Sequence, residues 1–227
     1  MREAAEPSGN ERPGGRGQRL PAAERRAQIL RVARDLFVQE GIERTSLRRI
    51  ADGAGITPTA IYDHFADKQD LLAAVAGDFL DGLIVAMQEE PADPADPLDR
   101  LRALGRGYVR YGVGHPHEYR LVFMTTLPAF SPVPGHRAPP GADPVCPPNK
   151  GMQSFGVLEA EITRLLELGL LVPGNRHAYA DALWATMHGI VSLLITHAHF
   201  NWTPIDELVG TATDMLLRGI SVPGRLA

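Results

Sequence analysis

Apolar residues recur every three or four positions along most of the chain, which is the spacing of one face of an α-helix. The first such run predicts a helix over residues 22–39. A longer run predicts a helix over residues 67–89, which leaves the N-terminal region and enters the second half of the chain. Three prolines then break the pattern, at positions 91, 94 and 97.

The second half of the chain predicts five more helices, separated by Pro and Gly residues: 98–113, 117–126, 149–168, 175–198 and a last one after Pro204. No segment shows the alternation of apolar and polar residues that indicates a β-strand. We therefore expect an all-α protein of about nine helices. Its domains are a three-helix N-terminal domain over residues 22–70 and a larger helical domain over residues 71–227.

The predicted helix at 175–198 is apolar on two faces. One face carries Trp184, Met187, Val191 and Ile195, and the other carries Leu183, Ile190 and Leu194. A helix that is apolar on two sides must be buried on two sides, and a domain of this size cannot easily cover both. We therefore expect a homodimer that forms through the last two helices.

Residues 45–68 contain the start and stop signals of two short helices and the beginning of a third. Thr45 and Ser46 suit a helix N-terminus, and Gly55 suits the left-handed conformation of a tight turn. Thr57 can cap the next helix, with Pro58 at its first position. A helix, a Gly turn and a short second helix form the pattern of a helix-turn-helix.

The same stretch resembles the DNA-binding signature of TetR-type transcriptional repressors. The residues that carry the resemblance run from Ile50 to Leu71, with the spacing Ile-Ala-(x3)-Gly-Ile-Thr-(x3)-Ile-Tyr-(x)-His-Phe-(x2)-Lys-(x2)-Leu. The likeness extends back to Ile29. It implies a DNA-reading domain at the N-terminus and a ligand-binding domain after it.

The second helix of this motif, residues 57–63, should lie in the major groove of DNA. The candidate DNA-binding residues are Thr45, Ser46, Arg48, Arg49, Thr57, Pro58, Thr59, Ala60, Tyr62, His64 and Lys68. The resemblance implies that Arg48 reads a guanine and that Tyr62, His64 and Lys68 hold phosphates. Arg49 could equally be a solvated charge, and Asp63 departs from the family pattern because a carboxylate repels phosphate.

The second half of the chain contains a weaker resemblance. Trp184-Ala-Thr-Met-His188-Gly189 is similar to the Trp-(x3)-His-Gly motif of one subclass of TetR-type ligand-binding domains. Candidate ligand-binding residues are Tyr108, Tyr111, Phe123, Met124, Phe155, Trp184 and His188, although each of them could instead be an ordinary core residue.

Composition changes this interpretation only slightly. The chain has 227 residues and a net charge of −4, with a mildly positive balance confined to the first 70 residues, so DNA binding must rely on local placement of a few cations.

Residues 1–21 are expected to form a disordered basic arm that follows phosphates or stays solvated. The lone Cys146 excludes an internal disulfide, and no run of about eighteen apolar residues suggests a membrane span, so we expect a cytoplasmic protein.

These patterns predict a ligand-responsive repressor that binds a palindromic operator as a homodimer and is released by a small, largely apolar inducer. No cofactor is expected. One alternative is a helical small-molecule-binding protein or an enzyme whose helix-turn-helix is only structural, although no nucleophile elbow or phosphate loop is present. The other alternative is a metal-sensing regulator. It is disfavoured because the pairs His115/His117 and His197/His199 have a spacing that puts them on different helix faces.

Overall fold

The computed structural model describes residues 20–125 and 150–223, and within those ranges it contains nine helices and no strand beyond one isolated bridge. The helices are α1 (Ala22–Glu40), α2 (Leu47–Ala54), α3 (Pro58–Tyr62), α4 (Lys68–Glu89), α5 (Asp99–Gly114), α6 (Pro116–Phe123), α7 (Lys150–Glu167), α8 (Arg176–Thr196) and α9 (Ile205–Ile220). The predicted all-α class is confirmed. The predicted basic arm and the Pro-rich loop at 128–148 lie almost wholly outside the described residues.

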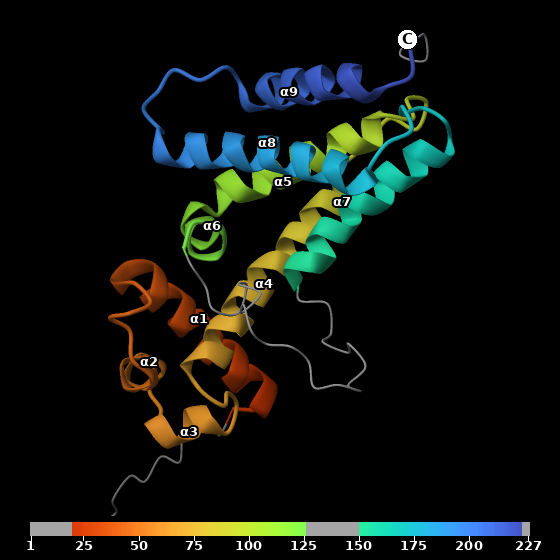
Figure 1. The fold of residues 1–227 in the computed structure, drawn as a ribbon. Coiled ribbons are helices and arrows are strands. Elements are labelled where there is room, and N and C mark those ends of the chain that lie inside the picture. The colour runs from red at the N-terminus through yellow and green to blue at the C-terminus, as the bar shows by residue number, and fades with distance from the viewer. Residues whose placement is uncertain (1–19, 126–149, 224–227) are drawn as a thin grey trace, which may run out of the picture.

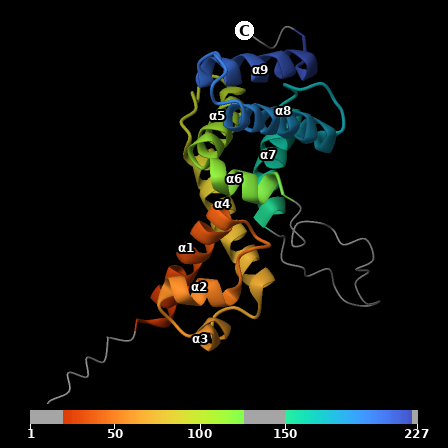
Figure 2. The ribbon, with the colours of Figure 1, turned by 90° about the vertical axis from the view of Figure 1, so that its left-hand side faces the viewer.

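The helices form two lobes that share one helix (Figures 1 and 2). Helices α1, α2 and α3 form the smaller lobe, and α5, α7, α8 and α9 form the larger one. Helix α4 runs from the smaller lobe into the larger one, while α6 lies between the lobes and packs against α1. The boundary expected at residue 70 therefore falls inside a continuous helix.

Local capping explains how the short helices begin and end. The Ser46 side chain accepts the backbone N–H of Arg49, and that of Thr57 accepts the N–H of Ala60. Gly55 ends α2 with φ of 65°, a conformation that costs glycine nothing. The Asp67 side chain accepts the N–H of Asp70 and so starts α4. These caps fix where α2, α3 and α4 begin and where α2 ends.

Helix α4 has a buried face along nearly its whole length. Its buried residues are Leu71, Leu72, Val75, Ala76, Phe79, Leu80, Leu83 and Met87. The helix packs on α1 in the smaller lobe and on α5 and α7 in the larger one, so a single apolar core runs through both lobes. At about 1.5 Å per residue, its 22 residues span roughly 33 Å.

Helices α4 and α5 approach most closely at Gly107. A Cβ atom at that position would lie 2.5 Å from the carbonyl oxygen of Ala86 and 2.9 Å from the Cα of Met87. Both are backbone atoms and cannot rotate away. Glycine is therefore required here for α5 to lie directly against α4.

Helix α8 passes through the middle of the larger lobe, in contact with α5, α7 and α9. By length and mean hydropathy alone it could cross a membrane. Its buried residues Leu183, Met187, Val191 and Ile195 instead pack on neighbouring helices. One helix of this length and hydropathy is weak evidence for a membrane span.

Substituting Gly107→Ala should destabilise the fold by about 1–3 kcal/mol, because the added methyl group forces α4 and α5 apart. A matched control is Gly156→Ala in α7, where a Cβ meets nothing within 4 Å and should stabilise by about 0.5–1 kcal/mol. Urea denaturation measures both. Equal effects of the two substitutions would contradict the close approach.

Candidate nucleic-acid interface and ligand cavity

Helix α3 shows its polar side to solvent and its apolar side to the core. Ile61 is fully buried, whereas Pro58 and Thr59 are exposed and the Tyr62 side chain is 59% exposed. Ala60 is half-buried, and the exposed Thr57 uses its hydroxyl as an acceptor for the cap. The structure therefore presents the predicted reading helix with its N-terminal residues at the surface, as a major-groove reader requires.

Two adjacent arginines of α2 are in different situations. Arg49 donates from Nε and Nη2 to the Glu40 carboxylate, at 3.2 and 3.0 Å, and so is held against α1. Arg48 is exposed and has no hydrogen-bond or ion-pair partner among the described residues. A free guanidinium can bond the O6 and N7 atoms of guanine, so Arg48 is the better base reader of the two.

Thr45 does not belong to the DNA-binding surface, contrary to the sequence-based prediction. Its side chain is fully buried, and its hydroxyl bonds the carbonyl oxygens of Gly41 at 2.8 Å and Leu36 at 3.3 Å. Those carbonyls lie at the C-terminal end of α1, where the helix leaves acceptors unpaired. Thr45 therefore holds the turn between α1 and α2, and Ser46 alone caps α2.

The remaining candidates flank the start of α4. The Lys68 ammonium donates to the Ile42 carbonyl at 2.5 Å, which ties α4 to the α1–α2 turn and leaves two further N–H groups for an anion. His64 is half-buried. Asp63 ends α3, is exposed and has no partner among the described residues, so it still has no structural explanation.

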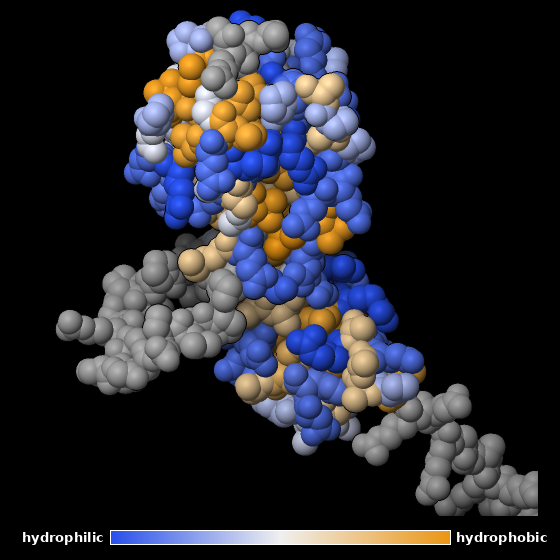
Figure 3. Space-filling model, turned by 90° about the vertical axis from the view of Figure 1, so that its right-hand side faces the viewer, coloured by the Kyte–Doolittle hydropathy of each residue, from blue (hydrophilic) through white to orange (hydrophobic). Residues whose placement is uncertain are grey.

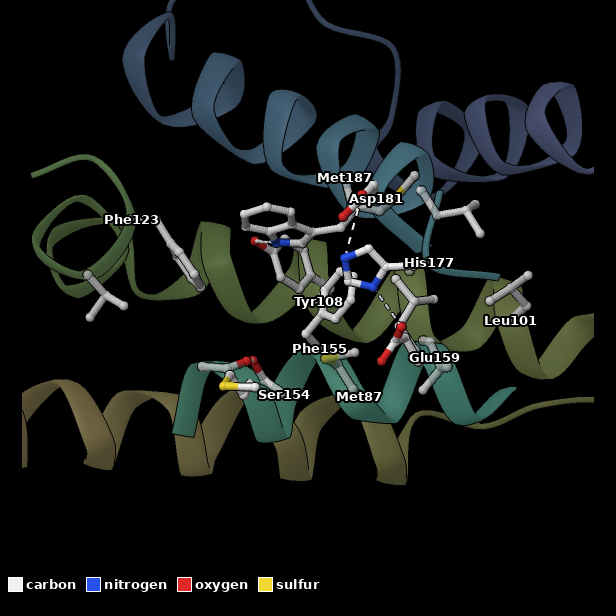
Figure 4. Close-up of a pocket in the computed structure, with 18 of the residues that line it drawn as sticks. Met87, Leu101, Tyr108, Phe123, Ser154, Phe155, Glu159, His177, Asp181 and Met187 are labelled. Atoms are coloured by element: carbon white, nitrogen blue, oxygen red, sulfur yellow. Dashed lines mark hydrogen bonds and ion pairs between the residues drawn. The ribbon is translucent and has the colours of Figure 1, made fainter. Parts of the chain in front are cut away.

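The larger lobe contains a cavity of about 900 Å³ between α4, α5, α6, α7, α8 and α9 (Figure 4). Four predicted ligand residues line it: Tyr108, Phe123, Phe155 and Trp184. Apolar residues that were not predicted complete most of the wall: Met87, Leu101, Leu104, Val122, Met152, Leu158, Leu183 and Met187. A mostly apolar pocket of this size is typical of small-molecule sites.

Three predicted ligand residues lie outside this cavity. Tyr111 stacks on His115, with ring centroids 4.1 Å apart, on the other side of α5. The Met124 side chain is 41% exposed at the end of α6. His188 lies behind the cavity wall, where its Nδ1 shares a hydrogen bond with the Tyr119 hydroxyl. Helical periodicity indicates that a residue faces inward, but does not say whether it meets a cavity or a neighbouring side chain.

A chain of hydrogen bonds leads from the cavity wall to His188. Trp184 Nε1 donates to the Tyr108 hydroxyl at 3.3 Å, that hydroxyl lies 2.9 Å from the Tyr119 hydroxyl, and Tyr119 lies 2.6 Å from His188 Nδ1. Burial raises the pKa of Tyr108 to about 12 and also raises the pKa of Tyr119. Burial lowers the pKa of His188, which favours a neutral imidazole.

A second polar group at the cavity was not predicted. His177 of α8 places Nδ1 2.8 Å from Glu159 of α7 and Nε2 3.8 Å from Asp181, so the imidazole bridges the two helices (Figure 4). The hydrogen bond to Glu159, and then the charge of Asp181, raise the pKa of His177. Among the described residues, no group of three His, Cys, Asp or Glu side chains is arranged to hold a metal ion.

Sequence comparison agrees with this architecture in both lobes. The sequence model of bacterial regulatory proteins of the tetR family matches residues 29–75, and that of the Tetracyclin repressor-like C-terminal domain matches residues 101–216. This chain belongs to the TetR family. It is therefore a transcription regulator and not an enzyme. The resemblance to the Trp-His-Gly subclass stays a prediction.

Individual relatives within the TetR family match parts of the chain. The HTH-type transcriptional activator FasR of Mycolicibacterium smegmatis is 34% identical over 126 residues, covering 54% of this chain and 58% of that protein. The HTH-type transcriptional repressor KstR2 of Mycobacterium tuberculosis is 38% identical over 80 residues, covering 35% and 40% respectively. The matched segments thus span about half the length of these relatives.

Solved structures of similar fold cover almost the whole chain. A protein of unknown function from Rhodococcus sp. RHA1 has 27% identity and a TM-score of 0.68, covering 93% of this chain and all of that one. A putative tetR family regulator from Shewanella sp. PV-4 has 18% identity and a TM-score of 0.67, covering 87% and 98%. At the latter identity the likeness shows the fold alone.

Arg48→Ala should weaken binding to the specific site of this TetR-family protein by about 1–3 kcal/mol and relax its preference at one base pair. Arg49→Ala removes the same charge, but the side chain that it removes is held in an exposed ion pair with Glu40. It should therefore weaken operator binding by less than about 1 kcal/mol. Fluorescence anisotropy with single-base operator variants distinguishes the two. Identical specificity profiles would rule out the reader role of Arg48.

The ion pairs of His177 should stabilise the fold at low pH. Because its folded pKa is raised, the contribution is fully present below the unfolded value of about 6.5 and disappears as pH rises through the folded pKa. The melting temperature of the unsubstituted protein should exceed that of His177→Gln by more at pH 5.5 than at pH 8.5. His117→Gln, whose imidazole is exposed without a partner among the described residues, should show no such trend.

Proposed function

We propose that this chain is a ligand-responsive repressor that binds a palindromic operator as a homodimer and is released by a small, largely apolar inducer. The observation that carries the proposal is that one helix serves both sites. Met87 of α4 lines the cavity, while Lys68 at the other end of the same helix donates to the Ile42 carbonyl in the DNA-binding lobe. A ligand that moves α4 therefore moves the DNA-binding lobe.

Exposed apolar side chains on α8 and α9 support the homodimer. Leu193 is 46% exposed and Met215 is 71% exposed, and Figure 3 shows apolar surface gathered on the upper part of the molecule, where these helices lie. Patches of this kind mark interaction sites. Two copies related by a two-fold axis would pack α8 and α9 against each other as a four-helix bundle.

A two-fold symmetric dimer would explain why we expect a palindromic operator. Two reading helices about 34–36 Å apart would enter successive major grooves on one side of the duplex, and a two-fold protein requires a near-palindromic site. Because DNA is in the cytoplasm, we place the protein there.

Induction requires that the ligand bind the DNA-incompetent arrangement more tightly than the DNA-competent one. Helix α6 offers a second connection besides α4. It carries Phe123 of the cavity wall, and its Glu118 lies 3.8 Å from Arg34 of α1. Occupancy of the cavity can thus act on the DNA-binding lobe through two helices.

The names of the relatives include both a repressor and an activator. KstR2 is named a repressor, whereas FasR is named an activator. A reporter gene placed behind the operator discriminates the two. We expect expression to rise when the gene for this protein is deleted, and a fall on deletion would identify an activator.

A gel shift on the DNA upstream of its own gene tests the proposal as a whole. We expect retardation of a dimer at low salt, with affinity that falls as salt rises. Absence of retardation would favour a ligand-binding protein whose helix-turn-helix is only structural. A change in retardation caused by Zn²⁺ or Cu²⁺ alone would favour the metal-sensing alternative.

Leu193→Glu should produce a monomer in sedimentation velocity and weaken operator binding at least about tenfold, because each dimer would bury two unpaired charges. The matched control is Val85→Glu on α4, which is 49% exposed and lies outside the predicted interface. It should leave the dimer and its operator affinity intact. A dimeric Leu193→Glu variant would show that α8 is not in the interface.

A further inference from the structure

Among the described residues that line the cavity, carboxylates outnumber the groups that can carry positive charge. Glu159 and Asp181 supply two carboxylates and His177 supplies one imidazole, while no Lys or Arg lines the cavity among the described residues. Lys150, at the start of α7, is paired with Asp81 on the outer side of α4. A ligand therefore meets an excess of negative charge.

These groups occupy one side of the cavity. Figure 4 shows Glu159 reaching from α7 and Asp181 from α8, with the His177 ring between them and aromatic side chains behind. Phe155 meets the His177 ring edge-on, with centroids 5.3 Å apart, and Trp184 meets Phe155 with centroids 6.1 Å apart. Carboxylates beside aromatic rings form a good environment for an organic cation.

The other polar side chains at the cavity already have hydrogen-bond partners within the protein. The Trp184 N–H and the Tyr108 hydroxyl belong to the hydrogen-bond chain that ends at His188. The Thr213 hydroxyl donates to the Val209 carbonyl, and that of Ser154 to the Gly151 carbonyl. The carboxylates are the anionic acceptors among the described residues that line the cavity, and His177 uses no more than one oxygen of each.

We propose that the cavity binds an amphiphilic amine, with its apolar body between α5, α6 and α8 and its ammonium group at Glu159 and Asp181. This inference rests on the proposed function and names the chemical class of the inducer. The ammonium donates charge-assisted hydrogen bonds to the two carboxylates. The two carboxylates repel a carboxylate ligand of the same length. The affinity for an uncharged alcohol should lie between the affinities for the amine and for the acid.

The test uses the full-length protein and three probes of equal length: decylamine, decanol and decanoate, each below its micelle-forming concentration. Isothermal titration calorimetry at pH 7 should show decylamine binding at least about tenfold more tightly than decanoate. Equal affinity of the amine and the acid, or tighter binding of the acid, overturns the inference and leaves the proposed function standing. Failure of all three probes to bind overturns both the inference and the ligand-response half of the proposed function.

Glu159→Gln should lower the affinity for decylamine and raise that for decanoate, and a gain for the acid cannot result from misfolding. The matched control is Glu167→Gln, which removes the same charge two turns further along α7, outside the cavity. It should leave both affinities unchanged. Equal effects of the two substitutions would show that general electrostatics, and not the cavity carboxylates, select the ligand.

Discussion

The structure depends on one helix that is buried in two lobes at once. Leu72 and Val75 of α4 belong to the same apolar core as Leu83 and Met87, and the helix is not broken between them. A rigid helix transmits displacement along its axis, whereas a flexible linker would absorb it. The absence of a side chain at Gly107 lets α5 lie directly on this helix, so the wall of the cavity and the support of the DNA-binding lobe are one structure.

The DNA-binding surface and the cavity lie at opposite ends of α4 and differ in their chemistry. At one end a weakly basic lobe must bind DNA with few cations, of which Arg48 is free and Lys68 is partly used by the Ile42 carbonyl. At the other end the cavity is apolar, with carboxylates on one side. Net charge therefore says little about this protein, and local placement of a few groups decides what each site can bind.

Features encoded locally were predictable from the sequence. Helix positions followed from apolar spacing, and the caps at Ser46 and Thr57 followed from residue type. Features that depend on packing between distant segments were not predictable. Thr45 had the right chemistry for a cap but is buried by the α1–α2 turn, and His188 faces inward but reaches Tyr119 instead of the cavity.

The missed polar group illustrates the same limit. Glu159 and His177 are 18 positions apart on different helices, and no periodic pattern connects them. Their contact exists only because α7 and α8 pack side by side, and that packing was not expressed in any short motif. The DNA-binding motif was recognisable because all of its parts lie within one local stretch of chain.

Pulsed electron–electron double resonance between spin labels on the two α2 helices tests the central claim most directly. The label would be attached at Asp52→Cys, an exposed position outside the candidate DNA-binding residues, in a protein whose only native cysteine, Cys146, is replaced by Ser. We predict one distance distribution with operator DNA and a different one with a ligand that calorimetry shows to bind, the free protein populating both. Coinciding distributions in the operator-bound and ligand-bound proteins would contradict the account.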